Sequence, residues 1–490
     1  MVDIVVGLKD YSMLKVSCER GIAAELSDYF SFMVPGAKFM PAYKNRAWDG
    51  KIRLYNALQG ELNAGLFVYL MEFCKERGYV IDVEETDYGF PFSKTQVEDD
   101  FLKEFYEHLK LPYEMRDYQH DAIKTAVNRR RGVFISPTGS GKSLIAYSLT
   151  RFIMGAAKGK VLIIVPTTSL VEQMHKDFVD YGWDGEKVHK IYSGKDKTTK
   201  KRVIISTWQS IYKFPKAWFE QFDGVIGDEC HGFKSKSLSS IMNKATEAKY
   251  RFGLTGTLDG TQTHKLVLEG LFGPVYQVTV TKKLQDDGTL APLDITVINM
   301  VYSDETRQAF GSKTYQDEID FIVKHEKRNK FIRNLALSQT GNTLVLFHRV
   351  EKHGKVLVDL IRDKAAEGRQ IFYVSGEVAT EDREAIRRIV ETQKDAVIVA
   401  SMGTFSTGIN IRNLHNIVFA SPSKSQIKVL QSIGRGLRKS DDGSTTKLFD
   451  LADDLHWKER KNFTLLHCFE RVKIYKKEQF NYTITQVNIE

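Results

Sequence analysis

Residues 131–154 read RGVFISPTGSGKSLIAYSLTRFIM. The stretch begins as a short apolar run, passes through a segment of small residues at 136–143, and continues as an apolar helical pattern. A strand, a glycine-rich turn and a helix in this order make one building block of a parallel α/β sheet. The segment therefore predicts a doubly wound α/β fold around it.

The glycine-rich turn has the residue types that a phosphate site requires. Gly139 and Gly141 allow backbone angles that turn successive N–H groups toward phosphate oxygens, and the start of the helix adds partial positive charge. Lys142 supplies a point charge to the phosphates, and Ser143 offers a hydroxyl to Mg²⁺. Ser136 stands where the P-loop pattern has its first glycine. We therefore predict nucleotide contacts from Thr138, Gly139, Ser140, Gly141, Lys142 and Ser143.

An acidic pair follows a second apolar run, 86 positions after Lys142. Asp228 and Glu229 end the run GVIG, and a strand that ends in two carboxylates is typical of a Walker B segment. We expect Asp228 to join the magnesium shell and Glu229 to orient and deprotonate the attacking water. For the nearby His231, the alternative to a role in this site is that of a capping or packing histidine.

Short apolar runs alternate with helical patterns on both sides of a polar stretch. The runs are 132–137, 160–166, 202–208, 224–229 and 250–257, and then 342–349, 370–376, 396–401, 416–421 and 446–451. This alternation predicts two consecutive α/β domains, with the polar stretch 281–303 as a linker. The resulting boundaries are 96–282 for the first domain, 283–455 for the second, and 456–490 for a basic helix and tail.

The first 95 residues have a different texture and predict a small α+β domain. Within it, residues 44–56, KNRAWDGKIRLYN, read as two strands joined at an Asp-Gly turn. Basic residues interleaved with an aromatic can bind phosphate and stack on a base, so Trp48, Lys51 and Arg53 are candidate nucleic-acid contacts. The alternative is a hairpin with Trp48 in its own small core. The basic segment 458–477 likewise has two interpretations, as a DNA contact or as a solvated face.

Composition narrows the class of protein. The chain has 490 residues, 42% hydrophobic and 27% charged, which is an ordinary globular balance. Its 71 basic and 62 acidic residues give a net charge of +9, which favours polyanionic partners. Four scattered cysteines without a CxxC pair argue against a zinc module, an iron–sulfur site or a disulfide framework. Without a signal peptide or a membrane-length apolar run, we expect a cytoplasmic location and no membrane partner.

At this point the ordered motifs resemble those of the superfamily 2 helicases of the DExH kind. The matching segments are Arg116–Gln119, Ser136–Ser143, Pro166–Leu170, Ser206–Gln209, Asp228–His231, Leu254–Thr257, Leu346–Arg349, Val374–Glu377, Ser406–Asn410 and Gln431–Arg438. The resemblance implies two tandem RecA-like domains that hydrolyse ATP with Mg²⁺ and move along nucleic acid.

The resemblance also assigns roles to particular residues. Arg116 and Gln119 would hold the adenine, Gly408 and Asn410 would contact the nucleotide, and Gln431, Arg435 and Arg438 would serve catalysis, the two arginines as fingers. Nucleic-acid contacts are implied for Thr167, Thr207, Gln209, Arg349, Ser375, Gly376 and Thr404. Phosphate contacts carry no base code, which suits a motor that accepts any sequence.

Residues 30–56 further resemble a group of phage recombination helicases. Members of that group act on branched DNA, by fork regression, Holliday-junction branch migration, and unwinding of D-loops and R-loops. The resemblance implies a monomer that works on branched or single-stranded DNA, and on RNA–DNA hybrids, in the cytoplasm of an infected bacterium.

Three alternatives remain open from the sequence. The motifs do not decide sugar chemistry, so a DExH RNA helicase is one alternative. An ATP-gated nucleic-acid binder that does not separate strands is the second. The third is the motor subunit of a restriction-type enzyme, although the chain shows no convincing Asp…Glu-x-Lys nuclease arrangement outside the motor.

Overall fold

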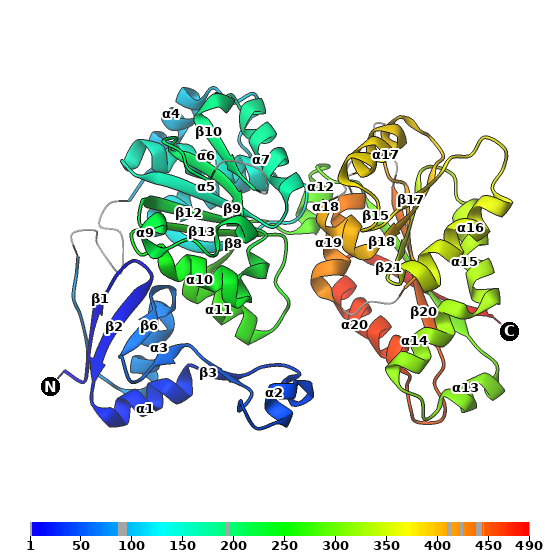
Figure 1. Ribbon diagram of the computed structural model, residues 1–490, viewed down its shortest axis with the longest axis horizontal. Coiled ribbons are helices and arrows are strands. Elements are labelled where there is room, and N and C mark those ends of the chain that lie inside the picture. Colours follow the sequence, from blue (N-terminus) through cyan, green and yellow to red (C-terminus); the bar gives the residue numbers. More distant parts are fainter. Residues whose placement is uncertain are drawn as a thin grey trace. The chain divides into compact units, whose positions relative to one another are not determined.

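The computed structural model describes residues 2–86, 96–192, 197–408, 411, 413–421, 425–437, 443 and 445–489 (Figure 1). The chain divides into two compact units. The first comprises Met1–Ser136 and Gly141–Val278, and the second comprises Pro137–Ser140 and Thr279–Glu490. Each unit contains one seven-stranded parallel sheet, and the first also contains a five-stranded mixed sheet.

The two parallel sheets share one topology. The strand order is β10-β11-β9-β12-β13-β8-β14 in the first and β17-β18-β16-β19-β20-β15-β21 in the second, so each label rises by seven between equivalent strands. The first sheet consists of β8 (Arg131–Ile135), β9 (Lys160–Val165), β10 (Val188–Ile191), β11 (Val203–Thr207), β12 (Phe222–Asp228), β13 (Tyr250–Thr255) and β14 (Val275–Gln277). The second consists of β15 (Leu293–Val301), β16 (Thr343–Phe347), β17 (Ile371–Val374), β18 (Val397–Ser401), β19 (Asn416–Phe419), β20 (Thr446–Asp454) and β21 (Asn481–Asn488). The predicted tandem RecA-like fold is confirmed.

Helices cover both faces of the first sheet, which explains why its strands are apolar throughout. Those of this domain are α4 (Asp99–Leu109), α5 (Asp117–Arg129), α6 (Lys142–Ala156), α7 (Thr168–Asp180), α8 (Trp208–Ile211), α9 (Lys216–Phe219), α10 (Lys236–Lys244) and α11 (Gln262–Phe272). In Figure 1, α6 and α7 lie on one face, and α10 and α11 on the other. Glycines bring both layers close to β12, since a Cβ at Gly224 would meet Ile153 at 2.8 Å and one at Gly227 would meet Phe233 at 2.9 Å.

Strands β15 and β21 form one edge of the second sheet. β15 pairs in parallel with both β20 and β21 and lies between them. The linker predicted at 281–303 is therefore wrong over Leu293–Val301, where Ile295 and Val297 are buried. The helices here are α12 (Thr281–Asp286), α13 (Asp304–Phe310), α14 (Tyr315–Lys324), α15 (Glu326–Ser338), α16 (Lys355–Lys364), α17 (Thr380–Thr392), α18 (Met402–Gly408), α19 (Gln426–Gly436) and α20 (Phe463–Lys477).

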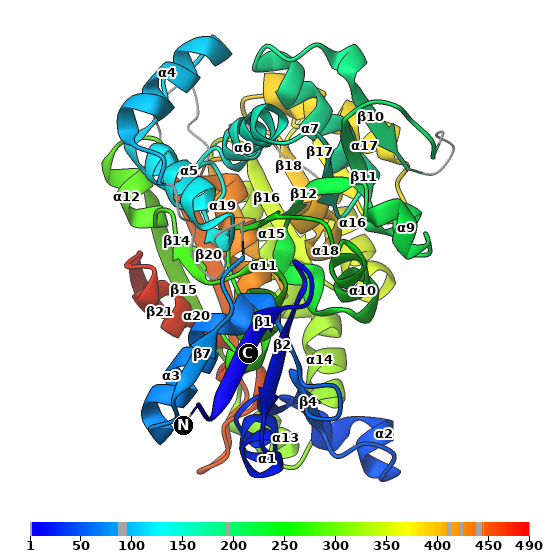
Figure 2. The same ribbon diagram turned by 90° about the vertical axis from the view of Figure 1, so that its left-hand side faces the viewer.

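The N-terminal domain is built on a mixed sheet of order β5-β6-β2-β1-β7, in which β1 lies between β2 and β7 (Figure 2). Its elements are β1 (Ile4–Leu8), β2 (Met13–Cys18), α1 (Arg20–Tyr29), β3 (Ser31–Met33), α2 (Pro41–Lys44), β4 (Lys51–Arg53), β5 (Tyr55–Asn56), β6 (Glu61–Asn63), α3 (Phe67–Arg77) and β7 (Ile81–Val83). The hairpin predicted at 44–56 is wrong. Helix α2 ends at Lys44, residues 45–50 form no strand, and β4 pairs instead with β3.

Within the first unit, the N-terminal domain packs directly on the RecA-like domain. Arg251 of β13 is 1% exposed and donates to Ser12 Oγ at 2.5 Å and to the Ala245 carbonyl at 2.5 Å. Tyr69 of α3 donates to the Glu269 carboxylate of α11 at 2.6 Å. A buried cation and a carboxylate thus tie the small domain to the motor domain.

Candidate active site

The glycine-rich turn leaves β8 and enters α6 as predicted. Gly139 and Gly141 have φ angles of +85° and +82°, in the left-handed region that favours glycine. Ser140 closes the turn by donating from Oγ to the Pro137 carbonyl at 2.6 Å. Lys142 donates to the Ser136 carbonyl at 3.0 Å, and Ser143 shares a 2.8 Å hydrogen bond with the Tyr181 hydroxyl.

The acidic pair lies at the same edge of the first sheet as Ser136 because their strands are close neighbours. β13 lies between β8 and β12, and all three strands are parallel, so their carboxyl ends meet at one edge. Asp228 ends β12, and Glu229 follows with a φ of +49° that only a constrained turn imposes on a non-glycine residue. Burial and the Glu229 carboxylate raise the pKa of Asp228, and Lys142 opposes that rise. Two crowded carboxylates beside a lysine suit a bound cation.

A hydrogen-bonded chain leads away from Glu229. Thr255 at the end of β13 donates to Glu229 Oε2 at 3.4 Å and lies 3.0 Å from His231 Nδ1. His231 Nδ1 is 3.2 Å from the same Glu229 oxygen. His264 of α11 contacts the His231 carbonyl at 2.8 Å and the Asp259 carboxylate at 2.9 Å. His231 is therefore part of the acidic site rather than a simple packing residue.

Sequence reasoning did not identify His264 and Asp259. Both lie just beyond the segment Leu254–Thr257, and a histidine in an apolar helix gives no signal of its own. His264 is 3% exposed, and the register of α11 on β13 is what brings it to His231. Only the three-dimensional structure could reveal this arrangement.

The two candidate adenine residues lie at the start of α5, beside the turn. Gln119 is 3% exposed, and its side-chain oxygen accepts from the Arg116 backbone N–H at 3.1 Å. A Cβ at Gly141 would meet Gln119 Nε2 at 2.3 Å, so this glycine is required for the close approach of the amide. The Arg116 guanidinium donates to the Tyr118 hydroxyl at 2.8 Å.

Three candidate nucleic-acid contacts of the first unit lie at the ends of two adjacent strands. Thr167 follows β9 and caps α7 through Leu170 N at 3.4 Å, and Thr207 ends β11. Gln209 donates to the carbonyl of Pro166 at 3.2 Å, which joins the two strand ends. The structure therefore brings these three candidates together.

The candidates of the second unit occupy the equivalent edge of its own sheet. Arg349 follows β16, and Ser375 and Gly376 follow β17. Thr404 of α18 shares a 2.7 Å hydrogen bond with Ser401, and its Oγ1 lies 4.0 Å from the position of a Cβ on Gly376.

Several predicted catalytic residues cannot be placed in full. Gln431 is half-buried on α19, and Gly408 ends α18. Arg435 is described only as backbone on α19. Arg438 and Asn410 lie outside the described residues.

The basic candidates of the N-terminal domain and the tail have local partners. Trp48 is half-buried and donates from Nε1 to the Lys51 carbonyl at 2.8 Å. Arg53 pairs with Asp49 at 2.5 Å, and this hydrogen bond lowers the pKa of Asp49 to about 2. In α20, Arg471 is 1% exposed and pairs with Asp450 at 2.8 Å. Arg471 of the basic segment 458–477 therefore belongs to the core. It is neither a DNA contact nor part of a solvated face, the two expected alternatives.

Metal and membrane features can be checked over the described ranges. No cluster of three or more His, Cys, Asp or Glu side chains within them could hold a metal ion. A Mg²⁺ ion held by one carboxylate, one hydroxyl and substrate phosphates needs no such cluster. No helix among those residues is long and apolar enough to cross a bilayer.

Three comparisons with known proteins identify the family. Residues 3–84 match the family described as the N-terminal domain of DNA helicase UvsW, residues 112–260 the res subunit of type III restriction enzymes, and residues 326–440 the helicase conserved C-terminal domain. The chain is 38% identical over 509 residues to the ATP-dependent DNA helicase uvsW of Enterobacteria phage T4, covering 99% of this chain and 100% of that protein.

A more distant relative and a solved structure agree with this match. The chain is 24% identical over 444 residues to the DNA 3'-5' translocase XPB2 of Sulfurisphaera tokodaii, covering 84% of this chain and 93% of that protein. The crystal structure of T4 UvsW matches with a TM-score of 0.51 at 34% identity, covering 100% of both chains. The chain therefore belongs to the UvsW family of ATP-dependent DNA helicases, within superfamily 2.

Proposed function

We propose that this helicase acts on branched DNA in recombination and repair, by fork regression, Holliday-junction branch migration, and unwinding of D-loops and R-loops. The observation that carries the proposal is that similarity to the UvsW helicase extends over residues 3–84, outside the motor. RecA-like domains and their motifs occur in motors with many substrates, so a shared additional domain is the feature that points to a shared substrate.

For ATP turnover, we infer a division of labour among the residues of the phosphate edge. Lys142 and the turn Thr138–Gly141 bind the phosphates, while Ser143 and Asp228 hold Mg²⁺, which supplies charge neutralisation when bound. Glu229 positions and deprotonates the attacking water, with His231 and Thr255 fixing its carboxylate. Arg435 and Arg438 would supply the arginine fingers.

The N-terminal domain is the proposed site of substrate choice. Lys51 is exposed beside the half-buried Trp48, so a basic side chain and a partly accessible indole share one surface. Arg53 is already paired with Asp49, which weakens its claim as a phosphate contact. We propose that the protein acts as a monomer in the cytoplasm of an infected bacterium.

ATP hydrolysis against a panel of nucleic acids tests the substrate. The full chain is assayed with Mg²⁺ and a four-way junction, a fork, plain duplex, single-stranded DNA or single-stranded RNA, with Lys142→Ala as the inactive control. We expect the junction and the fork to give the highest kcat, and Trp48→Ala to reduce turnover more on forks than on plain single strands. Equal stimulation by all DNAs, or stronger stimulation by RNA, would overturn the branched-DNA role.

A further inference from the structure

A pocket of about 460 Å³ lies in the second unit, at the carboxyl ends of β16 and β19. The chain leaves β16 toward β17, on one side of the sheet, and leaves β19 toward β20, on the other. Neighbouring parallel strands whose connections diverge in this way open a crevice, and ligands of α/β sheets bind in such crevices. The pocket thus lies where this topology favours a ligand.

The pocket walls have a distinctive chemistry. Its floor is apolar, since Ile322 and Val323 are 1% and 3% exposed. Its rim carries aromatic rings that remain accessible, with Tyr315 41% and Phe463 37% exposed. The residues that line it are Tyr315, Ile319, Ile322, Val323, His348, Arg349, Ser421, Ser425, Phe463 and His467. None of these described lining residues is acidic.

The rings and the arginine are arranged around one opening. The Tyr315 ring centroid lies 5.3 Å from that of His467 and 5.9 Å from that of Phe463, so three rings share the rim. The guanidinium of Arg349 is exposed and donates to Gln316 Oε1 at 3.0 Å, which keeps it next to Tyr315. A flat ring that carries an anionic substituent matches an apolar floor, aromatic walls and a cation at the mouth.

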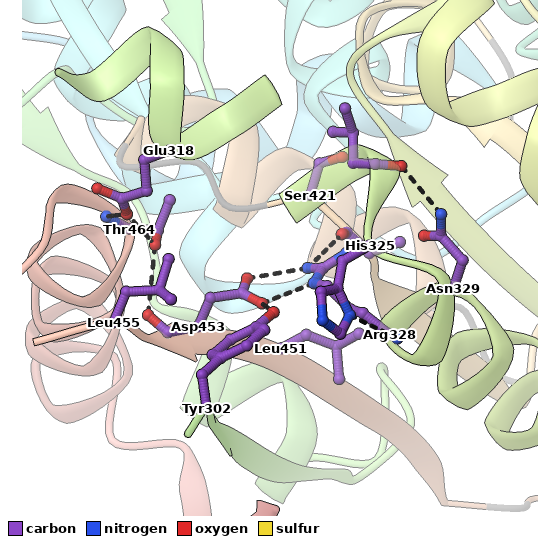
Figure 3. A network of polar contacts seen from close by, with 12 residues as sticks. Tyr302, Glu318, His325, Arg328, Asn329, Ser421, Leu451, Asp453, Leu455 and Thr464 are labelled. Carbon is purple, nitrogen blue, oxygen red and sulfur yellow. Dashed lines mark hydrogen bonds and ion pairs between the residues drawn. The ribbon is translucent and has the colours of Figure 1, made fainter. Parts of the chain in front are cut away.

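The two helices that supply the rim are pinned to each other by a buried carboxylate. Glu318 of α14 is 3% exposed and accepts hydrogen bonds from the start of α20 (Figure 3). Its donors are the Thr464 backbone N–H at 2.6 Å, the Phe463 backbone N–H at 2.9 Å and the Asn462 side-chain amide at 2.7 Å. Because these N–H groups cap α20, the spacing between Tyr315 and the rings of α20 is set before any ligand arrives.

The inner wall is equally fixed. Ser421 Oγ accepts from the His348 backbone N–H at 3.2 Å and contacts the ring of the buried His353 at 3.1 Å. The other ring nitrogen of His353 contacts Asn329 at 3.2 Å. A preformed pocket binds without the cost of ordering its own walls.

We propose that this pocket binds one unstacked base of a DNA strand, and that Arg349 contacts the phosphate next to that base. The recognised chemistry is a nucleobase with its phosphate, which a strand or a free mononucleotide could present. The basic chain and its membership of a DNA helicase family favour the strand. The inference goes beyond the proposed role on branched DNA and does not depend on it, because any single strand can supply the base.

The first test compares two single strands of equal length and charge with the full chain. One is oligo-dT, and the other is the same backbone with abasic residues at every position. Truncating a stacking aromatic costs about fivefold or more in affinity per base. We therefore expect Tyr315→Ala to raise the Kd for oligo-dT at least about fivefold and to leave the Kd for the abasic strand unchanged. An unchanged Kd for oligo-dT, or equal losses on both strands, would overturn the proposal.

Matched variants separate stacking from general damage. Phe469→Ala is the control, since Phe469 is 40% exposed on α20, the helix that supplies Phe463 and His467, and does not line the pocket. Tyr315→Phe keeps the ring and should bind like the wild type; if it loses as much affinity as Tyr315→Ala, stacking is not the cause. Arg349→Ala should weaken both strands alike and lower the salt dependence by about one phosphate contact.

Thymidine monophosphate distinguishes the two sources of the base. We expect it to compete weakly with oligo-dT, because it lacks the neighbouring phosphates that hold a strand. If it instead binds the wild type tightly and Tyr315→Ala leaves strand affinity intact, a mononucleotide is the ligand and the strand assignment fails. All of these strands are unbranched, so their result is independent of the junction panel.

Discussion

The substitution Gly65→Ala should loosen the N-terminal domain from the motor domain. Gly65 precedes α3 and faces the carboxyl end of α11 within the same unit. A Cβ there would lie 1.8 Å from the Glu269 carbonyl oxygen, 2.8 Å from the Gly270 oxygen and 2.9 Å from the Gly273 nitrogen. All three are backbone atoms, so no flexible side chain can move aside.

The size of the effect follows from the distance that must open. Ordinary contact begins at 3.4 Å, so relieving a 1.8 Å contact requires a shift of 3.4 − 1.8 = 1.6 Å. A shift of that size would break the 2.6 Å hydrogen bond from Tyr69 to Glu269. Overpacking costs about 1–3 kcal/mol and the loss of a hydrogen bond to a charged group about 1.5–3 kcal/mol. We therefore expect the docked state to lose about 3 kcal/mol.

Amide hydrogen exchange measures this loss locally, which suits a chain of several domains. A change of about 3 kcal/mol corresponds to about a hundredfold loss of protection for amides whose exchange requires undocking, such as the Tyr11 N–H, which donates to the Thr246 carbonyl of the motor domain. Gly21→Ala is the matched control, because its Cβ would meet nothing within 4 Å. If Gly65→Ala protects these amides as well as Gly21→Ala does, the argument from close contact is refuted.

Three further perturbations follow from single contacts. His231→Ala should reduce the kcat of ATP hydrolysis about tenfold, since the contacts that fix the Glu229 carboxylate and link it to Thr255 are lost; an unchanged kcat would contradict this. Arg328→Met should destabilise the second unit by about 3–5 kcal/mol, because it leaves the fully buried Asp453 carboxylate without its cation, and urea unfolding with Lys330→Met as control checks it. Burial lowers the pKa of His353 to about 3 from 6.5. Between these values only the unfolded chain binds the proton, so stability should fall by about 1.4 kcal/mol per pH unit as the pH drops below about 6.5, and His353→Gln should flatten that slope.

Much of the motor could be predicted from sequence because its chemistry is local. The P-loop turn needs glycine at 139 and 141 for its backbone angles, and both residues have positive φ values. Asp228 ends a strand whose neighbours are fixed by the parallel topology. Strands buried on both faces read as continuous apolar runs, and this pattern located all five predicted strands of each sheet.

The missed features depend on contacts between distant segments. Residues 293–301 follow the polar segment 281–289, which suggested a linker, yet they form β15, which pairs with β20 and β21 and has buried side chains at Ile295 and Val297. In the sequence, Arg471 belongs to a basic segment that suggests a surface. In the structure it is buried and forms an ion pair with Asp450. The rim of the pocket combines Tyr315 with Phe463 and His467, which lie about 150 positions away in the sequence and in no motif.

The shared topology of the two sheets suggests different sites for the two ligands that we propose. β15 occupies the place in the second sheet that β8 has in the first. Tyr302, which follows β15, therefore corresponds in position to Ser136, which follows β8 and begins the glycine-rich turn. There, Tyr302 donates to Asp453 at 2.8 Å, and Arg328 pairs with the same carboxylate at 2.6 Å (Figure 3). A filled, buried ion pair leaves no backbone cradle for a phosphate at that strand end. The crevice between β16 and β19 stays open by contrast, and this is why we place the ligand of the second sheet there.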